Sequence, residues 1–139
     1  MKLKYREILW PAPAIVGFGL MITGVLGGAV SYAISPGTGA AVAAFILLIT
    51  GVAVVLTTKI IKVSDILRIG GYSLELNSIA KTEVLSQQEF RKQQKTTELV
   101  IGTSSAKNYL KIFIADAADP YQVWYVATRR PEQFLAALN

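Results

Sequence analysis

Hydrophobic residues form one long uncharged block near the N-terminus. Between Glu7 and Lys59 the chain carries no charged residue, and only the sequence Ser-Pro-Gly-Thr-Gly at residues 35–39 interrupts the block. A helix needs about 20 mainly apolar residues to cross the roughly 30 Å hydrocarbon core of a bilayer. Each half of the block has about that length, so the pattern predicts two transmembrane helices, over residues 14–34 and 40–58. We expect residues 1–58 to form a helical hairpin, the first of two domains.

Short apolar runs separated by turn residues follow the block and are typical of β-strands. They predict a series of short strands, at residues 60–63, 67–69, 72–76, 79–85, 99–101, 109–115 and 121–128. The polar residues 87–97 predict a solvated loop, and residues 116–120 predict a turn. Pro131, followed by Glu132, opens a short helix over residues 131–138. The apolar stripe of this helix consists of Phe134, Leu135 and Leu138.

This order of elements favours a small antiparallel β barrel or sandwich, formed by residues 59–139 and closed by the C-terminal helix. The layout is that of pleckstrin-homology-like barrels. The predicted fold class is therefore membrane α+β, with a two-helix transmembrane hairpin before the β domain. The last strand is apolar on both faces, so one face needs cover from the C-terminal helix, the membrane or a partner. Trp124 on this strand is a candidate partner-facing residue.

Basic residues flank the uncharged block on both sides, and the turn between its halves has none. The positive-inside rule then places both termini in the cytoplasm and the turn outside. Trp10 lies at the first boundary, where its amphipathic ring suits the headgroup region. Three basic residues follow the second span, namely Lys59, Lys62 and Arg68. They either form only this ordinary flank or bind anionic lipid.

Small residues recur at helical spacing in both predicted spans, and such faces let two helices approach closely in lipid. They are Gly17, Gly24, Gly28 and Ser31 in the first span and Ala40, Ala44 and Gly51 in the second. These faces either pack the hairpin against itself or contact another membrane protein.

The composition leaves few residues for catalysis or metal binding. Cysteine and histidine are absent, which removes thiolate chemistry and the usual general base and metal ligand. The spans carry no ionisable residue, which argues against an ion or proton path. Asp116 and Asp119 are expected to cap a turn through backbone hydrogen bonds, and Ser104 and Ser105 have no base near them in sequence. We therefore expect no enzyme activity, no cofactor, no metal and no nucleic-acid partner.

Three stretches of the chain resemble those of a known protein family. They are Tyr-Arg-Glu-Ile-Leu-Trp-Pro at residues 5–11, Asp-Ala-Ala-Asp-Pro at 116–120 with Trp-Tyr-Val at 124–126, and Thr-Arg-Arg-Pro-Glu at 128–132. In this order around a two-span hairpin, they are similar to a family of small actinobacterial membrane proteins catalogued as a domain of unknown function. The resemblance covers nearly the whole chain. It implies a location in the bacterial inner membrane and assigns no activity.

Two functions fit these features. The first is a non-enzymatic accessory or scaffold subunit of a bacterial inner-membrane complex, anchored by the hairpin and presenting a cytoplasmic β domain. The second is a membrane-tethered lipid- or ligand-sensing module that binds an anionic headgroup through its basic residues. Arg129 and Arg130 either face an acidic partner surface or are merely solvated.

Overall fold

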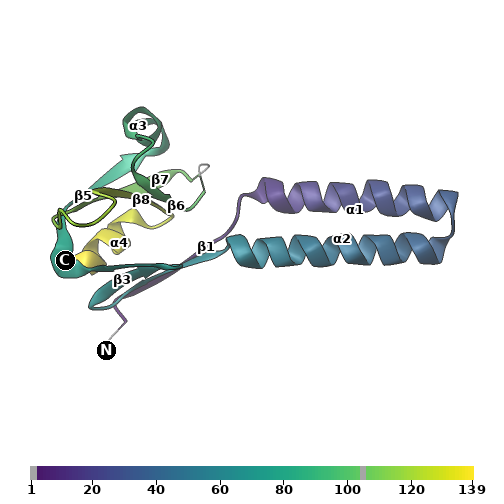
Figure 1. Ribbon diagram of the computed structural model, residues 1–139, viewed down its shortest axis with the longest axis horizontal. Helices are drawn as coiled ribbons and strands as arrows, with labels where there is room; N and C mark the ends of the chain where they lie inside the picture. The colour runs from purple at the N-terminus through teal and green to yellow at the C-terminus, as the bar shows by residue number, and fades with distance from the viewer. Residues whose placement is uncertain (1–2, 104–105) are drawn as a thin grey trace. The chain divides into compact units, whose positions relative to one another are not determined.

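The computed structural model describes residues 3–103 and 106–139, and the chain divides into two compact units (Figure 1). One unit is the helical hairpin, residues 10–58. The other is a β unit, which combines the chain up to Leu9 with residues 59–139. The predicted boundary, which assigned all of residues 1–58 to the hairpin, is corrected accordingly.

The hairpin consists of α1 (Pro13–Ala33) and α2 (Pro36–Thr57), both long and apolar enough to cross a membrane. The second helix begins at Pro36 rather than at the predicted Ala40. Ser35 caps it, because the Ser35 hydroxyl accepts a hydrogen bond from the Thr38 backbone N–H at 3.2 Å. Pro36 then fits the first helical turn. The sequence predicted as the break between the spans therefore starts the second helix.

The first sheet has the strand order β1-β2-β3-β4, and all its neighbouring strands are antiparallel. The strands are β1 (Tyr5–Leu9), β2 (Lys59–Val63), β3 (Ile66–Ile69) and β4 (Tyr72–Glu75). β1 has no counterpart among the predicted strands. It precedes the hairpin and pairs with β2, which follows the hairpin, so that Tyr5 lies opposite Val63 and Leu9 opposite Lys59. The hairpin is thus inserted between two paired strands of one sheet.

The second sheet has the order β5-β7-β8-β6, in which only the pair of β6 and β8 is parallel. Its strands are β5 (Ile79–Ser86), β6 (Leu99–Ile101), β7 (Asn108–Ile114) and β8 (Val123–Thr128). A 3-10 turn, η1 (Leu76–Ser78), connects the two sheets. Within the described residues the strands form two sheets and do not close into a barrel, so of the two predicted alternatives, barrel or sandwich, the barrel is wrong.

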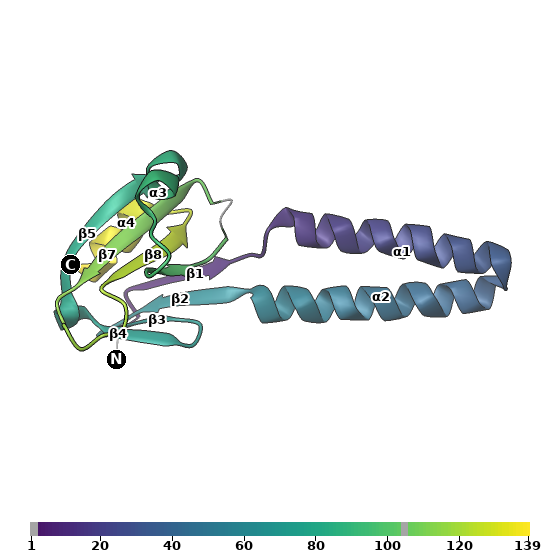
Figure 2. The ribbon, with the colours of Figure 1, turned by 45° about the horizontal axis from the view of Figure 1, so that its top comes forward.

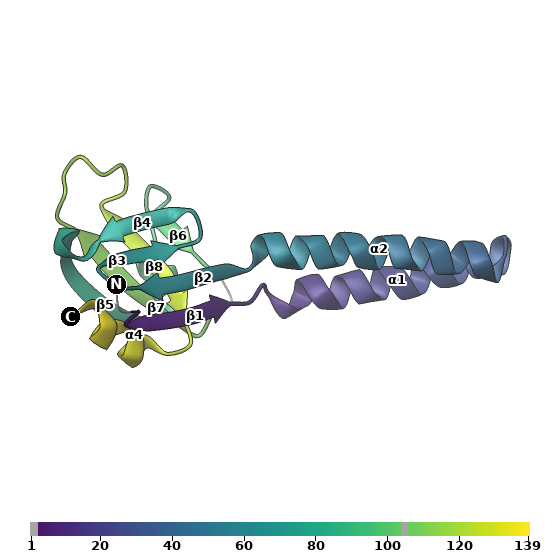
Figure 3. The ribbon, with the colours of Figure 1, turned by 90° about the horizontal axis from the view of Figure 1, so that it is seen from below.

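One hydrophobic core lies between the two sheets. Figure 3 shows the first sheet in front of the second, with α4 (Pro131–Leu138) beside β1. Phe134 of α4 is fully buried in this core. The strand residues around it that are most deeply buried are Ile61, Val63, Leu67, Ile69, Leu110, Ile112 and Val126. The predicted C-terminal helix is therefore confirmed, and its buried residues Phe134 and Ala137 contribute to this core.

A helix, α3 (Gln87–Gln93), stands where the sequence predicted a solvated loop at residues 87–97. Ser86 and Glu89 form a capping box, because each side chain accepts a hydrogen bond from the backbone N–H of the other, at 3.4 and 2.8 Å. Figure 2 shows α3 over the second sheet, where it contacts β5 and β7. Phe90 is its buried residue, so α3 covers the face of this sheet that lies away from the main core.

Candidate functional site

A buried carboxylate lies where the N-terminal strand meets the end of the last strand. Glu7 on β1 is 8% exposed, and both of its carboxylate oxygens accept hydrogen bonds. Oε2 accepts from the Tyr5 hydroxyl at 2.6 Å and from the Thr128 hydroxyl at 2.7 Å. Oε1 accepts from the backbone N–H of Arg129 at 2.8 Å. Burial of a carboxylate is costly without partners, and these three donors compensate for it.

Strand alternation explains how Glu7 comes to point inward. Tyr5, Glu7 and Leu9 are buried, whereas Arg6 and Ile8 between them are exposed. The Tyr5 ring stacks on Phe134 of α4, with centroids 5.3 Å apart and ring planes 5° apart. Burial, followed by the hydrogen bond to Glu7, raises the pKa of Tyr5 to about 12. The phenol is therefore a protonated donor to Glu7 at neutral pH.

Thr128 connects this carboxylate to the start of the C-terminal helix. Its hydroxyl donates to Glu7 and accepts a hydrogen bond from the backbone N–H of Arg130 at 3.1 Å. The Arg129 and Arg130 side chains are exposed. We name Tyr5, Glu7, Thr128 and Phe134 the β1–α4 junction. The junction brings together the first and the last of the stretches that carry the family resemblance, although Glu7 and Thr128 are 121 residues apart in the chain.

The β1–α4 junction connects the first strand, the end of the last strand and the C-terminal helix. All three donors that bond to the Glu7 carboxylate come from the chain itself. In residues 3–103 and 106–139, no group of three or more His, Cys, Asp or Glu side chains is placed to hold a metal ion. Sequence alternation did not indicate this junction, because polar Glu7 occupies a buried position of β1 and apolar Ile8 an exposed one.

The two aspartates of the predicted turn between β7 and β8 cap that turn. Asp116 Oδ1 accepts a hydrogen bond from the backbone N–H of Ala118 at 2.9 Å, and Asp119 Oδ1 accepts one from Tyr121 at 2.8 Å. Both are the local side-chain to backbone bonds that aspartate makes in turns. Ser104 and Ser105 lie outside the described residues.

Trp124 is not on a partner surface. It is 3% exposed and lies in the core between the sheets, edge-on to Tyr72 with ring centroids 5.9 Å apart. Tyr125 on the opposite face of β8 packs edge-on against Phe90 of α3, with centroids 5.2 Å apart, and burial raises its pKa to about 12. The prediction that one face of this strand needs cover is right. The helix α3 covers the Tyr125 face, whereas the C-terminal helix packs with Trp124 in the core between the sheets.

The hairpin packs through a stripe of small residues that differs from the predicted faces. Gly19, Gly27 and Gly39 are buried. A methyl group at Gly19 would collide with Thr50 of α2, and one at Gly27 would lie 3.1 Å from the Ala43 Cβ. A methyl group at Gly39 would lie 2.6 Å from the Gly27 carbonyl oxygen and would overlap the Ser31 side chain. Helix contact at these points depends on the missing side chains.

The predicted packing faces mostly point elsewhere. Within the described residues, a methyl group would meet no atom within 4 Å at Gly17, Gly24, Gly28 or Gly51. Ala40 and Ala44 of α2 are exposed. The interpretation that these six residues pack the hairpin against itself is therefore wrong. Gly28 and Ala40, for example, each follow a buried glycine by one residue, which rotates them away from the packing stripe by about 100°. Their contact with another membrane protein stays a prediction.

The basic residues after the hairpin do not share one face. Lys62 and Arg68 lie directly opposite each other on β2 and β3 and are exposed. Lys59 is two residues before buried Ile61 and therefore lies on the same face of β2. Its aliphatic stem lies beside the turn at Gly70, where an added methyl group would be 3.1 Å from Lys59 Cδ. Because Lys59 and Lys62 lie on opposite faces of β2, the three predicted basic residues do not form one lipid-binding group.

A third cation joins Lys62 and Arg68 in place of Lys59. Arg6 on β1 lies opposite Lys62, so three basic residues form one row across the first sheet. The sequence did not indicate this row, because its first member lies on the unpredicted strand. Trp10, the predicted membrane-interface residue, is 56% exposed.

Comparison with known families finds one match. The model of a family described as "Protein of unknown function (DUF3093)" matches residues 4–138. Comparisons with curated proteins and with solved structures find no match.

Proposed function

Since the chain belongs to the DUF3093 family, whose description names no activity, we propose that it is a non-enzymatic accessory or scaffold subunit of a bacterial membrane complex. The hairpin crosses the cytoplasmic membrane, and both of its ends lie on the cytoplasmic side. The β unit presents a cytoplasmic surface to the complex. The pairing of β1 with β2 supports this topology, because strands that pair directly must lie on the same side of the membrane.

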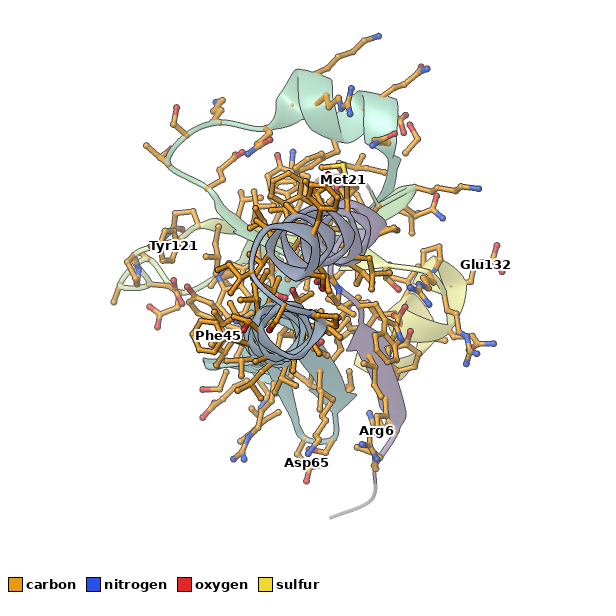
Figure 4. All side chains as sticks on the ribbon, turned by 90° about the vertical axis from the view of Figure 1, so that its right-hand side faces the viewer. Arg6, Met21, Phe45, Asp65, Tyr121 and Glu132 are labelled. Carbon is orange, nitrogen blue, oxygen red and sulfur yellow. The ribbon has the colours of Figure 1, made fainter. Side chains whose placement is uncertain are left out.

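The outer surface of the hairpin supports insertion into lipid. Figure 4 shows Met21 of α1 and Phe45 of α2 pointing away from the neighbouring helix. Many other large apolar side chains of these helices are exposed, among them Phe18, Leu20, Val25, Leu48, Val55 and Leu56. An apolar surface of this extent is unfavourable in water and suits hydrocarbon. Threonine hydroxyls within the helices bond to backbone carbonyls four residues earlier, at Thr23 and Thr50, which satisfies them without water.

The observation that carries the proposal is a second small-residue face that α2 does not cover. Gly17, Gly24 and Gly28 recur at helical spacing on α1, yet the hairpin packs through Gly19 and Gly27. Small faces allow close helix contact in lipid, where apolar side chains gain little from leaving lipid for one another. The face of Gly24 and Gly28 therefore fits a helix of another membrane protein.

The test is a quantitative purification of the tagged full chain from native membranes. We expect a partner at a fixed stoichiometry with the wild type, and its loss in the double variant Gly24→Leu/Gly28→Leu. The control is Ala29→Leu, which adds a large apolar side chain at another exposed position of α1. All three proteins are compared at equal yield, with the β unit checked by circular dichroism.

Two results would count against the subunit function. One is a wild-type protein that is purified from membranes without any stoichiometric protein. The other is a double variant that retains its partner as fully as the Ala29→Leu control.

A further inference from the structure

A row of three cations crosses the outer face of the first sheet. Strand pairing places Arg6 on β1 opposite Lys62 on β2, and Lys62 opposite Arg68 on β3. The row ends at Ser73, opposite Arg68 on β4. Side chains directly opposite each other on antiparallel strands have Cβ atoms about 5 Å apart. We name Arg6, Lys62 and Arg68 the cation row.

The cation row faces solvent and has no carboxylate of its own. All three residues are exposed, whereas the residues that precede and follow each of them on its strand are buried. The one salt bridge among the described residues joins Lys81 and Glu83, on another strand. Among the acidic residues of the first sheet and its turns, Glu7 is buried and bonded to Tyr5, Thr128 and the Arg129 backbone. Asp65 lies in the turn after β2, and Glu75 lies opposite Ile66, two residues along β4 from Ser73. Figure 4 shows the Arg6 side chain extending away from the strand.

Three like charges in adjacent positions weaken a sheet, since each repels its neighbour across the strands. Their alignment is therefore explained by an anion that binds them together. Arginine presents planar donors that match phosphate oxygens, and lysine adds a point charge. The row has the chemistry of a site for phosphate groups.

The position of the cation row along the chain identifies the source of that phosphate. Arg6 is seven residues before Pro13, the first residue of α1, and Lys62 is five residues after Thr57, the last residue of α2. Ile8 and Ile60 lie opposite each other on the same outer face, and along the chain they come between the row and the helices. Isoleucines next to the membrane segments and cations beyond them match the change from hydrocarbon to headgroups.

We propose that the cation row binds the phosphate groups of anionic phospholipids in the leaflet that the hairpin enters. The inference rests on the proposed insertion of the hairpin, but the row is a separate contact. Lipid bound there holds the outer face of the first sheet against the bilayer. Phosphate groups bound between the three cations compensate for the repulsion among them.

The test uses the full chain in nanodiscs of phosphatidylcholine with a minor share of phosphatidylglycerol. Native mass spectrometry then measures the ratio of the two lipids that remain bound to the protein. We expect enrichment of phosphatidylglycerol on the wild type and its loss, on the order of 10-fold or more, in Arg6→Gln/Lys62→Gln/Arg68→Gln, since each basic residue near a charged leaflet contributes severalfold. The matched control, Arg91→Gln/Lys92→Gln/Lys95→Gln, removes three exposed cations from α3 and the segment after it.

Each outcome of this test bears on the inference. A row variant that keeps the wild-type enrichment overturns it, and so does a control variant that loses as much. If millimolar inorganic phosphate removes the enrichment at constant ionic strength, the row is a free-phosphate site and the lipid assignment is wrong. Failure of the protein to enter nanodiscs at all would instead refute the insertion of the hairpin, which separates the two proposals.

Discussion

Excision of the whole hairpin is expected to leave a folded, soluble β unit, provided that β1 is kept. Leu9 and Lys59 are direct partners in an antiparallel ladder. A two-residue Asn-Gly turn is well suited to join such strands. We therefore expect a chain in which Asn-Gly replaces residues 10–58 to fold without membrane. We expect residues 59–139 alone to be severely destabilised.

The magnitude follows from what β1 buries. Tyr5 is 8% exposed and Leu9 is 7% exposed, and burial of a large side chain contributes about 1.5–3 kcal/mol. Loss of these two residues therefore costs about 3–6 kcal/mol by the same measure. Phe134, which is fully buried, also loses its stacking partner. A domain of this size has a total stability of about 5–15 kcal/mol, so removal of β1 takes away a large part of it.

Urea unfolding followed by tryptophan fluorescence measures the difference. The chain has two tryptophans, and excision removes Trp10, so that the buried Trp124 is the only reporter. The rejoined chain should unfold in one cooperative transition with a red shift in emission. Residues 59–139 should show a much lower midpoint or red-shifted emission without urea.

Substitutions within β1 provide the matched control. In the rejoined chain, Leu9→Ser should cost about 2–5 kcal/mol, the range for loss of a large core side chain. Ile8→Ser at the neighbouring outward position, 38% exposed, should cost clearly less. If residues 59–139 unfold at the same urea concentration as the rejoined chain, β1 is no part of the β unit and the reasoning is refuted.

Three further predictions concern single positions. Glu7→Gln should lower the free energy of unfolding by about 2 kcal/mol, because it weakens charge-assisted hydrogen bonds. Glu75→Gln, at an exposed position, should change the free energy of unfolding by less than about 0.5 kcal/mol, and equal losses would contradict the role of Glu7. The pKa of Tyr5 is raised from 10.0 to about 12, so the folded state holds this proton more tightly and stability should fall as pH rises through that window; denaturant unfolding of Tyr5→Phe should show a smaller fall, and an unchanged slope would refute the assignment. Gly27→Leu should lower the thermal stability of the hairpin in detergent while Gly28→Leu should not, since only Gly27 abuts α2; a reversed order would refute the packing stripe.

Local patterns in the sequence were sufficient to predict most of the elements. The uncharged block predicted both long helices, and alternation within residues 109–115 predicted β7, because strand and helix periods are properties of neighbouring residues. The helix α3 was missed although its signal was local. Ser86 followed by Glu89 is a capping box, and the polar composition of residues 87–97 outweighed it in the prediction.

The candidate site was not predictable in the same way, because its partners are distant in the chain. Nothing near Glu7 in sequence indicates that its carboxylate meets Thr128 or the Arg129 backbone. The cation row was missed for the same reason. In the sequence Arg6 is only one of the basic residues before the first helix, and its position opposite Lys62 follows only from the pairing of β1 with β2. In the spans the difficulty was different. Two small-residue stripes, one through Gly27 and one through Gly28, lie one helical step apart, and composition alone does not say which one faces α2.

These long-range contacts impose an order on assembly. β1 is made first, yet it has no strand partner until both helices and β2 have followed, because Tyr5 pairs with Val63. The Glu7 carboxylate then acquires its last donors only when Thr128 and Arg129 are in place, near the end of the chain. A hairpin with its ends on opposite sides of a membrane would leave β1 and β2 apart and Glu7 without two of its three donors. If the hairpin spans a membrane as proposed, completion of the β1–α4 junction requires both of its ends on the same side.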